Sequence, residues 1–425
     1  MAFYSGNIRT SILDPRLDKS NKIASFSLDS VDSIYLSNMR LMNIGVTASS
    51  FGDASGGFYN AAAGAYETIE RLTLFDGNTQ LSQQIQFPRW TAFKNFHKSN
   101  EANRSINHYL SGSGMGYEVN DLDISGSNSK NLKALSPAKK YTIEESTTFK
   151  SWLDLKMVLP LLQSSPFLST KVFKNLRLEI EYNAAVGTNQ NTTPPILVVD
   201  EIMDNETRNS LEKQLTQIDF VQIEHDMIVV DAISDLSSNK LTSVQSIQKQ
   251  VKGFDNKVLN RLLVVKQPQG ATYLNSFYMK QLTSYLQHNE KDNLRVNGRT
   301  LLVGDGLDTT AKSTAMLSDV WGTCNMYLNR LALDDNSDGT SVLDSNTTKD
   351  YLGTQDYRSF RVGQRIAQME YVFERTGCYD ASVPRENVPN QTGIPINCQL
   401  VLHFFGEIQK RLQVNSNGTY LISYL

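Results

Sequence analysis

LRLEIEY, at residues 176–182, decides the fold class, because every second residue in it is apolar. In an extended chain this alternation places four apolar side chains on one face: Leu176, Leu178, Ile180 and Tyr182. The opposite face is charged throughout. A period of two residues is typical of a half-buried antiparallel strand. We therefore expect a protein built from sheets, in which each strand turns one face to a core.

Three later segments repeat this alternation: 221–229, 367–374 and 398–405. The first has one face made of Val221, Ile223, His225, Met227 and Val229. Its other face carries Gln222, Glu224 and Asp226. The segment 398–405 is apolar on both faces, so we expect it in the middle of a sheet or at an interface.

Two dipeptides predict tight turns between strands. Asp76-Gly77 follows the apolar run 72–75, and Asn297-Gly298 separates two further strand-like runs. Both dipeptides readily adopt the positive φ angles that a two-residue hairpin needs. Strands joined by hairpins imply antiparallel sheets, and hence a sandwich or a barrel.

Helices are few. Residues 205–216 follow Asp204, which is a good N-cap, and a second candidate at 158–164 tolerates Pro160 only in its first turn. A third helix is expected over 309–321. We expect the first of these helices to separate two strand-rich domains, 1–204 and 218–425, with 205–217 as the linker. No residue-level repeat connects the two halves.

Two polar loops stand out, at 111–140 and 333–350, and loops of this length are usually functional or disordered.

The bulk composition excludes several classes of protein. A net charge of −3 argues against a broad basic face for nucleic acid, so any packaged DNA would be held weakly or indirectly. No apolar run approaches the roughly 18 residues of a membrane helix, and Met1–Ser5 lacks the features of a secretory signal. We expect no membrane insertion.

The cysteines indicate neither a disulfide framework nor a zinc site, because Cys324, Cys378 and Cys398 are odd in number and widely spaced. Three thiols in a reducing compartment are the simpler interpretation. Gly112-Ser113-Gly114-Met115-Gly116 has the wrong spacing for a dinucleotide fingerprint and indicates a flexible loop.

Residues 306–313 (GLDTTAKS) resemble a phosphate-binding loop, but Ala311 stands where the second glycine belongs. A strand at 196–201 resembles the partner strand of such a loop, yet it precedes the loop in the chain. We expect a turn and a helix N-terminus here.

In Glu224-His225-Asp226 neighbours on a strand point to opposite faces, so we expect a structural histidine. No catalytic, cofactor-binding or metal residue is assigned, and the chain is not expected to be an enzyme.

Several segments together resemble the major capsid proteins of the double jelly-roll lineage that includes PRD1 and adenovirus. They are similar above all to those of polinton-like viruses and virophages. The segments that carry the resemblance occur in order along the chain: 35–45, 64–71 with 75–77, 151–183, 294–298 with 304–306, and 374–377.

This resemblance implies an all-β fold of two consecutive eight-stranded jelly-roll barrels with a few short connecting helices. It also implies homotrimers, the pseudo-hexagonal capsomers that tile the icosahedral shell of a double-stranded DNA virus. The expected partners are neighbouring capsomers, a single jelly-roll penton protein, and minor or cement capsid proteins. The expected location is the virion, assembled inside the host cell. The alternative is a β-sandwich adhesin or spike that binds a glycan or receptor through its long loops.

Overall fold

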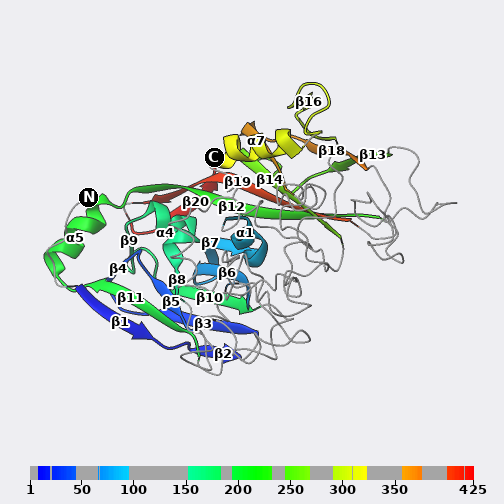
Figure 1. Cartoon of the computed structure of the whole chain (residues 1–425). Coiled ribbons are helices and arrows are strands. Elements are labelled where there is room, and N and C mark those ends of the chain that lie inside the picture. Colours follow the sequence, from blue (N-terminus) through cyan, green and yellow to red (C-terminus); the bar gives the residue numbers. More distant parts are fainter. Residues whose placement is uncertain are drawn as a thin grey trace, which may run out of the picture.

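The computed structural model describes residues 8–19, 22–44, 66, 68–94, 152–182, 194–231, 245–268, 291–308, 310–322, 357–375, 400–415 and 417–425. The fold described below is that of these residues (Figure 1). The expected loops at 111–140 and 333–350 lie outside them, as do the three cysteines and residues 112–116.

The first half of the chain forms two antiparallel sheets. Sheet I contains β1 (Ile8–Leu13), β4 (Ile34–Leu36), β5 (Arg40–Met42), β8 (Trp152–Asp154), β9 (Phe167–Ser169) and β11 (Ile196–Ile202). Strand β11 lies between β1 on one side and β4 and β5 on the other, and these two pair with β9 and β8. Sheet II has the order β2 (Leu17–Lys19), β3 (Ile23–Leu28), β10 (Leu176–Tyr182), β6 (Ile69–Asp76), β7 (Thr79–Ile85).

The second half also forms two sheets. Sheet III has the order β12 (Gln217–Val230), β19 (Leu400–Val414), β14 (Val258–Pro268), β17 (Tyr357–Arg365), and β20 (Tyr420–Tyr424) pairs with the far end of β19. Sheet IV has the order β13 (Gln245–Gln250), β18 (Met369–Arg375), β15 (Asp292–Val296), β16 (Arg299–Thr300). In Figure 1 the sheets of the first half, mostly blue and green, lie below β12 and β19.

The two halves share one topology. In the first half, β4 with β5 and β8 with β9 each act as one interrupted strand, and β2 is an additional edge strand that pairs with β3. When β2 and β20 are set aside as additions and the remaining strands of each half are numbered from one to eight along the chain, both halves show the sheet orders 1-8-3-6 and 2-7-4-5. Two four-stranded antiparallel sheets connected in this way form a jelly roll. The described residues therefore confirm the expected all-β fold of two consecutive eight-stranded jelly rolls.

Local signals account for many element boundaries. The buried and half-buried residues of β10 alternate as expected, and the predicted turns lie between β6 and β7 and between β15 and β16. Gly77 has φ = +56°, and Asn297 and Gly298 have φ = +51° and +78°, the left-handed region that these residue types tolerate.

The helices are short connectors: α1 (Phe87–Phe93), η5 (Leu155–Met157), α4 (Pro160–Ser164), α5 (Asn205–Gln214) and α7 (Thr310–Trp321). The Asp204 carboxylate accepts a hydrogen bond from the Thr207 N–H at 2.7 Å and caps α5, and Pro160 occupies the first turn of α4. All three predicted helices are confirmed. Among the described residues we find no helix with the length and apolar character needed to cross a bilayer.

A hydrophobic core lies in each jelly roll, but the sequence boundary between the halves is not the boundary between the cores. Ile218, Phe220 and Leu412, from β12 and β19, belong to the cluster of the first half. Tyr420 and Ile422 of β20 pack against the same cluster. The domain limits 1–204, 205–217 and 218–425 therefore stay a prediction.

The alternation expected along 221–229 holds only in part. Gln222, expected on the polar face, is fully buried, whereas Met227 and Val229 are 51% and 40% exposed. The cause is that β12 leaves one core and joins another. Gln222 is held by hydrogen bonds to Ser82 and Gln83 of β7 at the point of transfer. The predicted central position of 398–405 is confirmed by β19, which lies between β12 and β14.

Candidate functional site

Helix α1 connects the first jelly roll to the second. Phe87 lies in the first core, and Trp90 and Phe93, one turn apart, share a face that meets the second half. The Trp90 ring lies 5.6 Å from Trp321 of α7 and 5.7 Å from Phe405 of β19, measured between centroids. We call this aromatic contact the barrel junction. It joins elements that are far apart in the sequence.

Two histidines lie beside the barrel junction. His225 of β12 and His403 of β19 belong to adjacent strands, and their Nε2 and Nδ1 atoms are 3.1 Å apart. The rings stack with an interplanar angle of 29°, and His225 also contacts the Phe405 ring at 4.9 Å. A hydrogen bond between two ring nitrogens needs one protonated and one bare nitrogen, so the imidazole that accepts it is neutral in this arrangement.

The surroundings of the pair disfavour its charged form. Burial, followed by the Arg89 guanidinium, lowers the pKa of His225 to about 4, and the Asp226 carboxylate opposes this only weakly. Burial also lowers the pKa of His403 well below its usual value, with further contributions from Arg89 and His225. Both rings are thus held neutral at a place where charge would be repelled.

Glu224 and Asp226 point away from the histidine between them. Glu224 accepts from Lys257 at 2.6 Å and from Tyr424 at 3.0 Å, and its ion pair with Lys410 measures 3.0 Å. Burial raises the pKa of Glu224, but Lys410 and Lys257 outweigh it, so the carboxyl stays ionised. The predicted separation of His225 from these carboxylates is confirmed, and the three residues form no acid–base cluster.

A fully buried charge cluster lies within the second jelly roll. Asp292 receives Arg358 Nε at 2.7 Å, and Lys266 Nζ and the Tyr371 hydroxyl contact its other oxygen. Burial raises the pKa of Asp292, but Lys266 and Arg358 outweigh it and hold the pKa below its usual range. Lys266 also lies 4.9 Å from the Phe373 ring centroid, a cation–π contact. Sequence reasoning missed this cluster because its members come from four separate strands.

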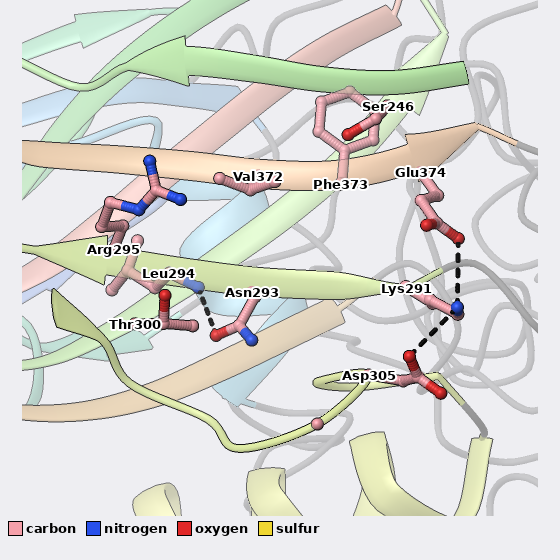
Figure 2. Close-up of a pocket in the computed structure, with 11 residues that line it drawn as sticks. Ser246, Lys291, Asn293, Leu294, Arg295, Thr300, Asp305, Val372, Phe373 and Glu374 are labelled. Carbon is pink, nitrogen blue, oxygen red and sulfur yellow. Dashed lines mark hydrogen bonds and ion pairs between the residues drawn. The ribbon is translucent and has the colours of Figure 1, made fainter. Parts of the chain in front are cut away.

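Sheet IV carries a hollow of about 220 Å³ beside β15, β18 and the turn after β16. Figure 2 shows Lys291 between Asp305 and Glu374, at 3.1 and 3.9 Å. Asp305 raises the pKa of Lys291, which therefore stays charged. Arg295, on the same wall, pairs with Glu370 at 3.3 Å. Lys291 and Arg295 are thus each paired with carboxylates at the wall of the hollow.

The segment at 306–313 is a turn and a helix start, as predicted. A Cβ at Gly306 would collide with the Asp292 carbonyl oxygen, and Leu307 pairs with Asp292 in a β-bridge. Lys312 forms an ion pair with Asp308 at 2.6 Å. The strand at 196–201 is part of β11 in sheet I. Across the described part of the chain, no three His, Cys, Asp or Glu side chains lie together in a way that could hold a metal ion.

The topology and the junction define a double jelly-roll protein. Solved structures with the same fold bear this out. The VP54 protein of PBCV-1, fitted into a reconstruction of the virophage Sputnik, aligns with a TM-score of 0.55 and 9% identity, covering 100% of this chain and 98% of that one. The mavirus major capsid protein aligns with a TM-score of 0.53 and 9% identity, covering 99% and 90%. No protein-family profile and no curated protein matches the sequence.

Proposed function

We propose that this chain is a structural major capsid protein whose homotrimers are the pseudo-hexagonal capsomers of an icosahedral double-stranded DNA virus shell. The observation that carries the proposal is the repeated topology: sheet orders 1-8-3-6 and 2-7-4-5 occur twice in one chain. It is supported by the mavirus major capsid protein, which aligns over nearly the whole chain.

The duplication explains why a trimer would serve as a hexagonal tile. Three copies of a chain with two similar barrels place six barrels around one axis. A cyclic three-fold contact joins two different patches of each subunit and closes on itself. Many modest contacts repeated over a shell then add up to a stable particle. We propose a virion location, with neighbouring capsomers, a penton protein and cement proteins as partners.

We also propose that the chain catalyses no reaction and holds packaged DNA weakly or indirectly. A net charge of −3 leaves little excess of cations for phosphate contacts. Within the buried cluster, Lys266 and Arg358 pair with Asp292. In the hollow, Lys291 pairs with Asp305. A similarity to the polinton-like virus and virophage subgroup belongs to the same proposal and rests on the sequence segments.

The first experiment is light scattering of the purified full chain, with negative-stain images of the same fractions. We expect a particle of three times the 47.7 kDa chain mass with a hexagonal outline. A monomer that stays monomeric when penton and cement proteins are added would contradict the capsid proposal. That result would favour the adhesin alternative, which a glycan-array screen would then test.

A further inference from the structure

The barrel junction brings together groups that respond to acid. His225 and His403 come from sheet III, and Arg89 comes from α1, which follows sheet II. His225 and Trp90 pack against the same ring, Phe405, at 4.9 and 5.7 Å. The contact that holds α1 against sheet III is therefore continuous with the histidine pair.

We propose that His225, His403 and Arg89 form an acid latch between the two jelly rolls, closed when both imidazoles are neutral and opened when they are protonated. The latch is defined by these three side chains. This inference does not depend on the proposed function, since it concerns the contact between two parts of one chain.

Protonation would break the latch in two ways. The single hydrogen bond at 3.1 Å needs a bare nitrogen, and a doubly protonated pair has none. Two cationic rings would then lie in contact in a buried place where like charges repel strongly, and the Arg89 charge, which disfavours the charged form of both rings, would add to the repulsion. Arg89 donates to Gln86, and Gln86 in turn donates to Glu70 of β6 at 2.6 Å, so Arg89 is tied to the first jelly roll. Repulsion would push α1 and sheet III apart.

Two carboxylates offset this repulsion only in part: Asp226 favours the charged form of His225, and Glu70 attracts Arg89. Asp226 neighbours His225 on β12, but its carboxylate accepts from the Gly253 N–H at 2.9 Å. Arg261 of β14 and Glu407 of β19 also flank the barrel junction, and they pair with each other at 2.6 Å. Arg261 also lies 4.3 Å from the Trp321 ring centroid, so this ion pair stands beside the junction tryptophan.

Opening would show a steep dependence on pH. In the closed form the pKa of His225 is about 4, and in an opened junction it would return towards 6.5. Each proton taken up on opening changes the closed-to-open ratio by up to about tenfold per pH unit, so two histidines give up to about a hundredfold. We expect the change between pH 6.5 and pH 4.

Tryptophan fluorescence reports the junction directly. Of the three tryptophans, Trp90 and Trp321 are in the junction, and they are 5% and 4% exposed. A W152F background of the full chain removes the third. We expect the tryptophan emission of this W152F variant to shift to longer wavelength, reversibly, as the pH falls from 7.5 to 4.

Two variants in the W152F background test the assignment. H225Q/H403Q keeps polar side chains without a titrating ring, and we expect the acid transition to disappear. R89Q removes the neighbouring positive charge, so protonation costs less in the closed junction, and we expect the transition to move to lower pH. A double variant that keeps the W152F transition would overturn the latch. If the double variant does not fold, R89Q decides: an unchanged midpoint, or a shift to higher pH, overturns the proposal.

Discussion

At the scale of single residues, the buried carboxylate of Asp292 is the most sensitive position we identify. It meets Lys266 and Arg358 where water does not reach, since Lys266 and Asp292 are fully buried. D292N keeps the shape and removes the charge, so two buried cations lose their shared carboxylate. We expect a loss of roughly 3–5 kcal/mol in the free energy of unfolding, measured by urea denaturation of the full chain.

The matched control is R361A, which removes a cation from an exposed pair. Arg361 and Asp319 are 66% and 65% exposed and 3.3 Å apart. Solvent screens such a pair, so its loss should cost no more than about 1 kcal/mol. Equal effects of D292N and R361A would show that the buried cluster is not a structural centre.

The two histidines contribute to the pH dependence of stability. The pKa of His225 is lowered in the folded protein, so between about pH 4 and pH 6.5 the unfolded chain binds more protons than the folded one. Stability therefore rises with pH through this window and is fully present above it. From His225 alone we expect about 3 kcal/mol less stability at pH 4 than at pH 7. Urea denaturation at a series of pH values measures it, and a flat profile would contradict it.

Gly406 shows how closely the second core is packed. A Cβ there would lie 2.8 Å from Phe254 Cδ1 and 2.9 Å from a methyl carbon of Leu259. We expect G406A to cost about 1–3 kcal/mol through overpacking. Adding F254L should recover part of that loss, because it removes the ring that is hit. Thermal unfolding of both variants tests the pair, and additive losses would contradict the steric explanation.

At the scale of elements, the turn between β15 and β16 does more than reverse the chain. The Asn297 side chain accepts from the N–H groups of Ala367 and Gln368 at 2.7 and 3.1 Å, and it donates to the Arg365 carbonyl at 2.9 Å. It therefore fixes the start of β18 as well as its own hairpin. Its φ of +51° adds a second requirement.

Two substitutions separate these roles. N297G keeps the freedom to adopt positive φ and removes the side-chain hydrogen bonds, at roughly 0.5–1.5 kcal/mol for each net bond lost. N297A removes the bonds and adds about 1 kcal/mol of backbone strain. We expect the urea midpoint to fall in the order wild type, N297G, N297A. Equal midpoints for the two variants would show that the backbone angle carries no cost.

The same elements show what the sequence predicts and what it does not. The burial of β10 was predictable because one face of this strand is buried along its whole length. The burial of β12 was not predictable. Its alternation shows which residues lie on the same face of the strand, but it does not show what packs against that face. Gln222 is buried by β7 and Met227 is left exposed, and neither neighbour is visible in the local pattern. The pairing of His225 with His403, 178 positions later, depends on the same strand register.

At the scale of the whole molecule, strands of the second half extend their ends over the core of the first half. The start of β12, the end of β19 and the first residues of β20 lie against the first core, where Ile218, Leu412 and Ile422 pack. The Tyr420 hydroxyl donates to Asp76 at 2.8 Å, and its ring contacts Phe173 at 5.1 Å. A duplicated topology therefore does not imply two independent folding units.

This overlap predicts that at neutral pH the chain unfolds as one cooperative unit. Trp152 lies in β8 of the first half, and Trp90 and Trp321 lie at the barrel junction. In W90F/W321F the fluorescence follows the first jelly roll, and in W152F it follows the junction. The fluorescence midpoint of each variant is compared with the circular dichroism midpoint of the same variant. We expect the two midpoints to coincide in both variants. If the junction probe instead changed first at pH 7, the second-half strand ends would cover the first core without being needed for its stability, and the division at 205–217 would mark a true domain limit.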